Sequence, residues 1–320
     1  MRVAGIDCGT NSIRLLVADA EPGDDGAPRL ADVHREMRVV RLGQGVDATG
    51  MLAPEALGRT FAAADDYAAT VKDLGAERVR FVATSAMRDA RNRDEFVAGI
   101  RSRFGVEPEI VPGTEEAALS FAGAASVLPL AAGRPVLVVD LGGGSTEFVL
   151  GDAAGVRAAR SIDMGCVRLT ERHLRSDPPT PEEIAAAERD VDAGIDEALA
   201  GVPLGEATAV IGVAGSITTI TAHALGLPAY QPERIHGSEL PIAQVAAACT
   251  SLLGLSHAQR AELPYMHPGR VDVIGAGALV WRRILARLSG LTDGRVSTAV
   301  TSEHDILDGI ALSTLTKKTT

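Results

Sequence analysis

The residues with the clearest chemical potential lie between positions 136 and 151. An apolar run there ends at Asp140, three consecutive glycines follow at 142–144, and Ser145 and Glu147 lead into a second apolar run. Consecutive glycines permit positive φ angles, so their N–H groups can approach a ligand closely and form a concave anion site. The stretch therefore predicts a strand, a turn of phosphate size and a second strand, with carboxylates beside the turn.

The same arrangement occurs a second time, within residues 3–17. Alignment of the two stretches without a gap matches Asp7 with Asp140, Gly9 with Gly142 and Ser12 with Ser145. An internal repeat of this kind indicates two related structural units. We therefore expect two halves of the chain, each contributing one acidic, glycine-containing hairpin to a shared cleft, with Asp7 and Asp140 close in space.

Further positions could contact an anion at strand-to-helix junctions. Gly215 and Ser216 follow a strand expected over 208–213, and a glycine turn at a helix N-terminus can bind phosphate or ribose. Arg88 also lies at such a junction, which is the usual ligand edge of an α/β layer. The arginines at 93, 101 and 103 are interpreted instead as part of a solvated helix face.

Two adjacent glutamates open another expected helix. Glu115 and Glu116 follow a Pro-Gly-Thr turn, and Thr114 is the expected N-cap. Acidic residues in the first turn of a helix commonly interact only with the helix dipole. For either glutamate taken alone, that structural explanation is preferred.

The elements that must hold these residues follow from hydrophobic spacing and capping residues. Helices are expected over 54–74, from the residues after Arg88 to about 104, from Thr114 onward, from the capping box at 180–183, over 270–281 and from about 303 onward. Besides the two hairpins, strands are expected over 32–42, 78–84, 106–111, 208–213 and 296–300, and a polar turn over 21–28.

Composition limits the classes of protein to which the chain can belong. A length of 320 residues favours two domains. The net charge of −11 argues against a general nucleic-acid-binding protein, which needs a basic face. Three scattered cysteines suggest neither a disulfide framework nor a zinc site. No apolar signal region follows Met1, and the charge-free run at 207–231 is interrupted by polar residues, so we expect a cytoplasmic protein without a membrane span.

The glycine turns do not include the lysine-containing phosphate loop of P-loop enzymes. In order and spacing they resemble the two phosphate motifs and the adenosine motif of the actin, chaperone ATPase and sugar-kinase superfamily. Within it, the sequence resembles the Ppx/GppA family of exopolyphosphatases and guanosine pentaphosphate phosphohydrolases. The segments that carry this resemblance are DLGGGSTE at 140–147, TSAMR at 84–88, GTEEA at 113–117, MGC at 164–166 and the segment around Arg270.

The resemblance covers nearly the whole chain and is greatest with short, two-domain members of actinobacterial type. It implies an α/β fold of two duplicated actin-like (ribonuclease H-like) ATPase domains, whose mixed sheets flank a central cleft. The first domain would comprise residues 1–125 with 303–320, and the second residues 126–302, with a hinge near 128–135. Because the sequence ends after this core, processive handling of long polyphosphate is not expected.

The resemblance also implies a reaction, in which water attacks a phosphoanhydride with the help of a metal. The enzyme would release terminal orthophosphate from short inorganic polyphosphate, convert guanosine pentaphosphate to the tetraphosphate, or do both. Glu116 would act as the base, with Glu147 as a second catalytic residue, and Asp7, Asp140 and Glu147 would hold Mg²⁺ or alternatively Mn²⁺. The phosphate-binding residues would be Asn11, Ser12, Arg88, Gly142, Gly143, Gly144, Ser145, Gly215 and Ser216.

Functions of other classes remain open from the sequence. A small-molecule kinase or ATPase of the actin superfamily would use the same hairpins, but it would need an acceptor pocket. A non-catalytic regulator would bind guanosine tetra- or pentaphosphate and act on a partner. The sequence does not distinguish polyphosphate from guanosine pentaphosphate as substrate. It leaves a homodimer open, while duplex nucleic acid and membranes are not expected as partners.

Overall fold

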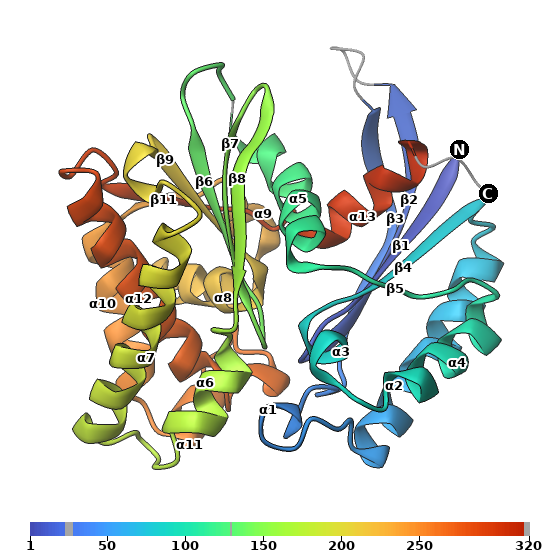
Figure 1. Ribbon diagram of the computed structural model, residues 1–320, viewed down its shortest axis with the longest axis horizontal. Helices are drawn as coiled ribbons and strands as arrows, with labels where there is room; N and C mark the ends of the chain where they lie inside the picture. The colour runs from blue at the N-terminus through green and yellow to red at the C-terminus, as the bar shows by residue number, and fades with distance from the viewer. Residues whose placement is uncertain (23–27, 129, 317–320) are drawn as a thin grey trace. The chain divides into compact units, whose positions relative to one another are not determined.

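The computed structural model describes residues 1–22, 28–128 and 130–316, and it divides into two compact α/β units. Unit 1 contains Met1–Gly123 and the C-terminal residues from Ile306 on, and unit 2 contains Ala124–Asp305. Each unit has its own hydrophobic core and one mixed sheet flanked by helices (Figure 1). The turn expected over 21–28 falls mainly outside the described residues.

The sheet of unit 1 is built around β1 (Arg2–Cys8), which is almost entirely buried. β2 (Ser12–Pro22) pairs antiparallel with β1, and β3 (Pro28–Val39) pairs antiparallel with β2. On the other side, β4 (Arg78–Ala83) and the two-residue β5 (Glu109–Ile110) add in parallel. The strand order is therefore β3-β2-β1-β4-β5. A strand covered on both faces is expected to be a continuous apolar run, which explains the composition of β1.

Unit 2 repeats this order. Its strands are β6 (Val136–Leu141), β7 (Thr146–Asp152), β8 (Gly155–Ile162), β9 (Ala209–Val213), β10 (Glu239–Pro241) and β11 (Thr298–Thr301). β6, β7 and β8 form an antiparallel meander, and β9 and β11 continue the sheet in parallel on the other side of β6. Apart from the short edge strand β10, the two sheets share strand order and directions. The α/β fold with two duplicated mixed sheets is thereby confirmed.

The helices of unit 1 are α1 (Val46–Thr49), α2 (Pro54–Asp73), α3 (Ser85–Asp89), α4 (Arg93–Phe104), α5 (Gly113–Ala124) and α13 (Ile306–Thr316). α13 comes from the end of the chain but packs on the first two strands, where Leu307 and Ala311 contact a cluster that includes Val3 (Figure 1). An ion pair between Arg35 of β3 and Asp308, at 2.5 Å, fastens it further.

The helices of unit 2 are α6 (Cys166–His173), α7 (Pro181–Leu199), α8 (Ala214–Ala224), α9 (Pro232–Ile235), α10 (Ile242–Gly254), α11 (His257–Ala261) and α12 (Ile274–Leu291), with 3₁₀ turns at η1 (Ala125–Val127), η2 (Leu204–Glu206) and η3 (Pro268–Arg270). The expected capping box of α7 is present: the Thr180 hydroxyl accepts the Glu183 N–H, and the Glu183 carboxylate accepts the Thr180 N–H.

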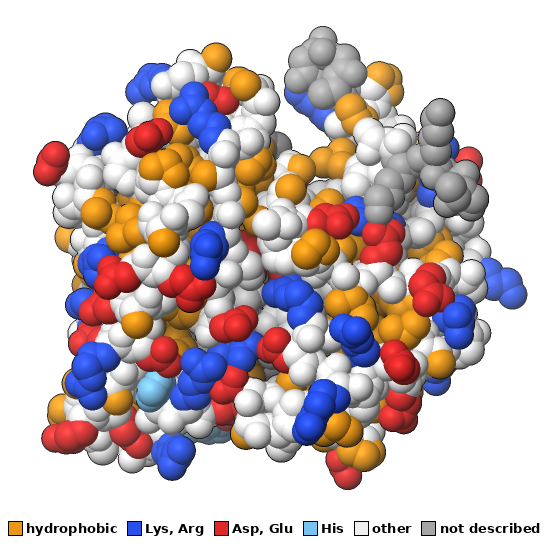
Figure 2. Space-filling model, viewed as in Figure 1, with side chains coloured by type: hydrophobic (Ala, Val, Ile, Leu, Met, Phe, Trp, Pro, Cys, Tyr) orange, Lys and Arg blue, Asp and Glu red, His pale blue; other side chains and the backbone are white. Residues whose placement is uncertain are grey.

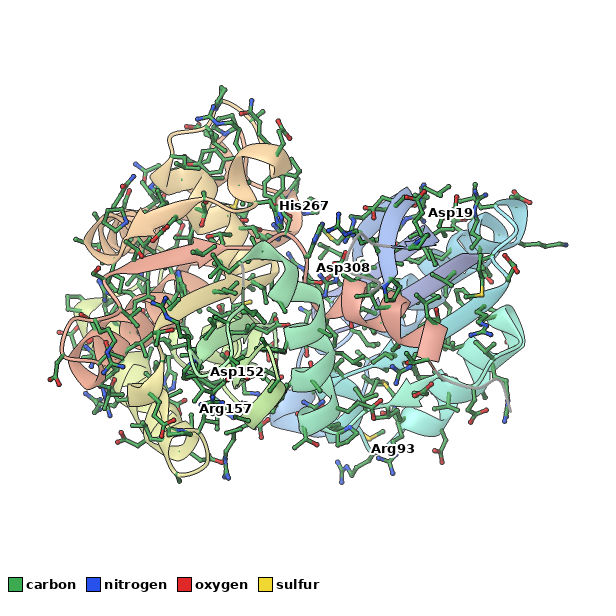
Figure 3. All side chains as sticks on the ribbon, turned by 90° about the horizontal axis from the view of Figure 1, so that it is seen from above. Asp19, Arg93, Asp152, Arg157, His267 and Asp308 are labelled. Atoms are coloured by element: carbon green, nitrogen blue, oxygen red, sulfur yellow. The ribbon has the colours of Figure 1, made fainter. Side chains whose placement is uncertain are left out.

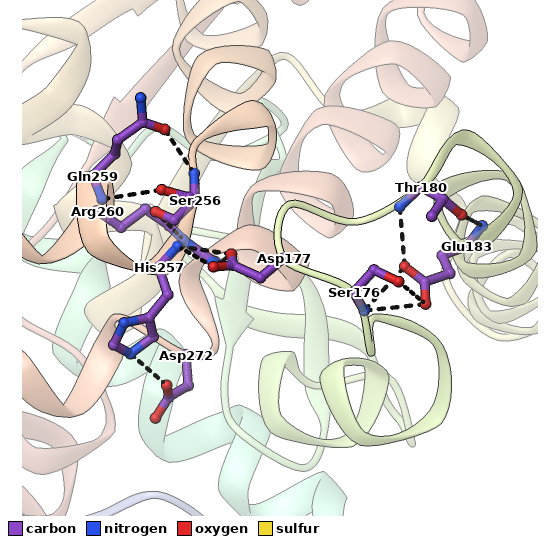
Figure 4. A network of polar contacts seen from close by, with 9 residues as sticks. All are labelled: Ser176, Asp177, Thr180, Glu183, Ser256, His257, Gln259, Arg260 and Asp272. Atoms are coloured by element: carbon purple, nitrogen blue, oxygen red, sulfur yellow. Dashed lines mark hydrogen bonds and ion pairs between the residues drawn. The ribbon is translucent and has the colours of Figure 1, made fainter.

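Asp177, in the loop before α7, is bonded to α11. Its carboxylate accepts the N–H of His257 at 2.7 and 2.9 Å and Nη2 of Arg260 at 3.2 Å (Figure 4). The ring of His257 lies 3.0 Å from the carboxylate of Asp272, a residue between η3 and α12. These contacts tie the segment around Arg270 to the rest of unit 2.

Two expected helix boundaries are wrong. The helix expected from the residues after Arg88 to about 104 begins only at Arg93, because Asn92 exchanges hydrogen bonds with the backbone of Leu52 at 2.8 and 3.1 Å; α3 is an additional helix before it. Such side-chain bonds to a neighbouring backbone compete with helix formation. The helix expected from Arg270 begins only at Ile274, because residues 268–270 form a separate 3₁₀ turn that starts at Pro268.

The expected N-cap of α5 is also wrong. The helix already includes Gly113, so Thr114 lies inside it, and the N–H groups of Glu115 and Glu116 both donate to the carbonyl of Pro112. The strand expected over 106–111 is reduced to β5, and the C-terminal helix begins at Ile306.

Acidic and basic side chains are interspersed over the face shown in Figure 2. Among the ion pairs are Arg2 with Asp19 and Arg157 with the buried Asp152; Asp19, Asp152 and Arg157 are labelled in Figure 3. Within the described part of the chain, no helix is long and apolar enough to cross a membrane.

Candidate active site

The turn of the first hairpin, in unit 1, is closed by a hydrogen bond from the N–H of Gly9 to the carbonyl of Ser12, at 2.9 Å. The carbonyl of Thr10 accepts the N–H of Gly43, and the carbonyl of Asn11 accepts the N–H groups of residues 40 and 41, at 2.8 to 3.0 Å. In a trans peptide the N–H points opposite to the C=O. The N–H groups of Asn11 and Ser12 therefore point away from this covering segment, as an anion-binding turn requires.

The turn of the second hairpin, in unit 2, is built in the same way. The N–H of Gly142 donates to the carbonyl of Ser145 at 3.0 Å. The carbonyls of Gly142 and Gly143 accept N–H groups from the first turn of α6, at 2.9 to 3.2 Å, and the carbonyl of Gly144 accepts Nε of Arg168 at 2.8 Å. The N–H groups of Gly143, Gly144 and Ser145 consequently face away from α6.

These bonds distinguish Gly142 from the other residues expected to bind phosphate. Its N–H is used inside the turn, as is that of Gly9, whereas those of Gly143 and Gly144 have no protein acceptor among the described residues. Gly142 therefore shapes the turn, and the concave row of N–H groups begins at Gly143.

Two glycines outside the turns allow this covering. A Cβ at Gly165, just before α6, would lie 2.2 Å from the carbonyl oxygen of Gly143 and 2.5 Å from the nitrogen of Gly144. A Cβ at Gly43 would lie 2.3 Å from a methyl carbon of Thr10 in the other turn. Real Cβ contacts are not that close. Glycine is needed at position 165 because the covering backbone lies directly on the turn, whereas a Cβ at position 43 would require the Thr10 side chain to shift.

The acidic residues of the two hairpins have different cross-strand partners. Asp7 pairs in register with Arg14, whose Nη2 lies 2.6 Å from its carboxylate. Asp140 pairs in register with Glu147, so the second hairpin carries two carboxylates that are 5% and 1% exposed. Oε1 of Glu147 accepts the hydroxyls of Ser145 and Ser161, each at 2.7 Å. The first carboxylate is thus neutralised by an arginine, whereas the second pair suits a cation.

Glu116 lies on α5 with its carboxylate turned into unit 1 and is 7% exposed. Its Oε2 accepts Nη1 of Arg88, and the same nitrogen donates to the carbonyl of Val111 at 3.2 Å. Burial raises the pKa of Glu116; the ion pair with Arg88 and a hydrogen bond from Thr84 oppose the rise, and the charge of Asp7 adds to it. Asp7, Arg88 and Glu116 therefore interact within one unit, although they are far apart in sequence.

Glu115, the neighbour of Glu116, faces elsewhere. Its carboxylate accepts Nη2 of Arg80 at 2.5 Å, and Arg80 also bonds to Glu109. Two of the α4 arginines interpreted as part of a solvated helix face form ion pairs: Arg101 with Glu107 and Arg103 with Asp65.

The third glycine turn, at the start of α8, is covered by side chains of unit 2. A Cβ at Gly215 would lie 2.2 Å from Nη2 of Arg270, so that guanidinium rests directly on this glycine. Arg270 also donates to the hydroxyl of Thr219 at 3.0 Å. Ser216 packs against Gly277, where a Cβ would lie 2.7 Å from its hydroxyl oxygen. A ligand above Gly215 would therefore meet Arg270 before it met the backbone.

Several residues of the site were not anticipated from the sequence. The hydroxyls of Thr10 and Ser85 are buried, at 7% and 2% exposure, and neither oxygen has a hydrogen-bond partner among the described residues. Buried polar atoms are nearly always hydrogen-bonded, so both indicate a partner that the protein does not supply. Arg14 could have been found from hairpin register, because it lies opposite Asp7. Arg168 gave no local signal.

Comparison with known proteins places these features in a family context. A model of the Ppx/GppA phosphatase family matches residues 16–314. Exopolyphosphatase 2 of Mycobacterium tuberculosis is 52% identical over 317 residues, which are 98% of each chain. A guanosine-5'-triphosphate,3'-diphosphate pyrophosphatase of Photobacterium profundum is 34% identical over 184 residues, 58% of this chain and 36% of its own. A solved exopolyphosphatase-like protein is similar with a TM-score of 0.90 and 47% identity, and 98% of each chain is covered.

Proposed function

Since the chain belongs to the Ppx/GppA phosphatase family and is thus a phosphoanhydride hydrolase, we propose that it releases terminal orthophosphate from short inorganic polyphosphate, from guanosine pentaphosphate, or from both. The observation that carries this proposal is the pair of anion-binding turns, each with its N–H groups turned away from a covering segment and a carboxylate beside it. Both candidate substrates end in the same phosphoanhydride, so both present the same charged group to such turns.

The phosphate chain is held by backbone N–H groups in this proposal. Those of Asn11 and Ser12 bind from the first turn, and those of Gly143, Gly144 and Ser145 from the second. In this proposal each turn binds phosphate, with Asp7 beside the first turn and Asp140 beside the second. The unpartnered hydroxyls of Thr10 and Ser85 are added as donors beside the first turn. Arg88, Gly215 and Ser216 remain proposed contacts, with Arg270 as the group that covers Gly215.

Phosphatases of this family generally depend on a divalent metal ion, and the second hairpin fits one. Mg²⁺ is usually held by one or two carboxylates together with substrate phosphates and water. Asp140 and Glu147 supply two buried carboxylates, and no group of three potential ligands occurs within the described residues. Asp7 would join them only in competition with Arg14. Mg²⁺, or Mn²⁺ in its place, would offset the charge that accumulates on the phosphoryl oxygens.

The chemical step is assigned to Glu116. Its carboxylate accepts a proton from water as the water oxygen bonds to the terminal phosphorus, and the bridging oxygen leaves with the shortened chain. A base with a raised pKa is better matched to this task near neutral pH than an ordinary carboxylate. Arg88 holds the carboxylate in place. Glu147, the second proposed catalytic residue, would help to hold the metal. We place the protein in the cytoplasm, without a duplex nucleic acid or membrane partner, and keep a homodimer as its proposed assembly.

One assay tests the proposal. The protein with Mg²⁺ is given short polyphosphate, long polyphosphate and guanosine pentaphosphate side by side, and orthophosphate release is measured. Release from at least one of them, fastest with a short chain, is the expected result. Binding without release under any metal condition would favour a non-catalytic regulator. In a parallel assay with ATP and a candidate small-molecule acceptor, formation of ADP with a phosphorylated product would favour a kinase.

A further inference from the structure

Arg168 makes two contacts with the second glycine turn. Its backbone N–H donates to the carbonyl of Gly143 at 3.2 Å, and its side-chain Nε donates to the carbonyl of Gly144 at 2.8 Å. The residue is 8% exposed, although it is an arginine on a short helix. The carboxylate of Asp163 lies 3.7 Å from Nη2 and is itself largely exposed. An ion pair that long and that exposed contributes little, so the bond to Gly144 restrains the side chain more than this ion pair does.

In the first hairpin, backbone groups hold the corresponding carbonyl. Asn11, the counterpart of Gly144 in the repeat, has its carbonyl held by two backbone N–H groups, those of Val40 and Arg41, at 3.0 and 2.9 Å. In the second hairpin the first turn of α6 reaches the carbonyls of Gly142 and Gly143, but its backbone does not reach Gly144. A side chain, that of Arg168, supplies the missing donor.

A hydrogen-bond donor to the carbonyl of Gly144 is important because glycine leaves the backbone flexible there. Gly144 is the last of three consecutive glycines, and glycine has more backbone conformations to lose than any other residue. The peptide between Gly144 and Ser145 could rotate so that its carbonyl, and not its N–H, faced the substrate. A carbonyl turned toward a phosphate would repel it. Holding the Gly144 carbonyl therefore determines where the Ser145 N–H points.

We propose that Arg168 is a positioning residue of the phosphate site: its Nε locks the Gly144–Ser145 peptide so that the Ser145 N–H faces the terminal phosphates. This inference rests on the proposed function of the second turn as a phosphate cradle. The guanidinium itself does not contact substrate in this scheme. Its charge also places a buried positive group one peptide away from the cradle, which favours an anion there.

Arg168→Met tests this role, because methionine keeps an unbranched apolar stem and removes the donor. A hydrogen bond to a charged partner is worth about 1.5–3 kcal/mol, so losing the restraint is expected to raise KM for tripolyphosphate about tenfold or more. The kcat is expected to change less than KM, because the base Glu116 lies in unit 1. The dissociation constant of tripolyphosphate, measured by calorimetry with Mg²⁺ present, is expected to rise in parallel.

Arg157→Met is the matched control. Arg157 is an arginine of the same unit that pairs with Asp152 at the β7–β8 hairpin, away from the glycine turn (Figure 3). It is expected to leave KM and the dissociation constant unchanged. If Arg168→Met does not fold, Arg168→Lys, which keeps the charge but moves the donor, carries the same test with an expected rise of about threefold.

The outcomes separate this inference from the proposed function. If the wild-type protein releases no orthophosphate but binds tripolyphosphate, the reaction is wrong, and calorimetry still decides the role of Arg168. If folded Arg168→Met, or Arg168→Lys in its place, keeps the wild-type KM and dissociation constant, Arg168 is only a packing residue and the inference is overturned. A fall in thermal midpoint with unchanged binding leads to the same conclusion.

Discussion

Nη1 of Arg88 lies 2.5 Å from Oε2 of Glu116, so the carboxylate proposed as the base is held by the arginine proposed to contact phosphate. This relationship joins two roles that the sequence suggested separately. A change at Arg88 is therefore expected to affect the proton-accepting group as well as substrate binding. It also means that the ionisation of Glu116 depends on a partner that substrate can compete for.

Glu116→Gln is expected to separate catalysis from binding. The amide has nearly the size of the carboxylate but cannot accept the proton, and general-base catalysis contributes roughly 10²–10⁴-fold, about 3–5 kcal/mol of barrier. The kcat for orthophosphate release should fall by about that factor, with KM within a few-fold of the wild-type value. Glu115→Gln is the control, because Glu115 shares the same helix turn but pairs with Arg80. Equal losses in both variants would remove Glu116 from the role of base.

The pH dependence of kcat/KM should report the raised pKa of Glu116. The base must be ionised, so activity is lost as pH falls through this pKa. Burial raises the pKa of Glu116. The acidic limb of the pH profile, where kcat/KM falls with falling pH, should therefore lie at a pH above the ordinary glutamate pKa of about 4.3. Arg88→Met removes an ion pair that lowers the pKa, so the limb should move to still higher pH. A limb that stays at the same pH in Arg88→Met would show that another group governs it.

Glu147→Gln should produce a defect that depends on metal concentration. If Asp140 and Glu147 hold the ion together, loss of one carboxylate weakens an equilibrium, and excess Mg²⁺ restores part of the activity by mass action. Rates measured across a Mg²⁺ titration check this. Glu116→Gln is the comparison, because its activity should not recover. A Glu147→Gln defect that is insensitive to Mg²⁺ would argue against a metal role.

Gly165→Ala should disturb the second turn from outside the site. The added methyl would lie 2.2 Å from the carbonyl oxygen of Gly143, so the turn must shift. We expect KM to rise about tenfold or more, as when one good hydrogen bond to an ion is lost. Gly254→Ala is the control, because a Cβ there has nothing within 4 Å. If the two variants have equal KM values, the turn tolerates the shift and its geometry is less restrictive than proposed.

Much of the local structure could be predicted from the sequence. The capping box at Thr180 and the helix over 54–74 formed as expected, because their signals lie within a few residues of one another. One boundary was wrong because of a distant segment: Asn92, just before α4, bonds to Leu52, forty positions away. The spacing of apolar residues around Asn92 does not indicate a hydrogen bond to so distant a residue.

What the sequence by itself determined is the repeat: two aspartate-containing hairpins with glycine turns, and hence two sheets with one strand order. Those features follow from the conformational freedom of glycine and from continuous apolar runs, which are properties of neighbouring residues. Only the tertiary structure decided that Glu116 and not Glu115 faces Asp7 and Arg88, that Arg270 covers Gly215, and that Arg168 holds Gly144. Each of these contacts joins residues from different helices, strands or loops. Which side chains come within a few ångströms of each other depends on how the whole unit packs.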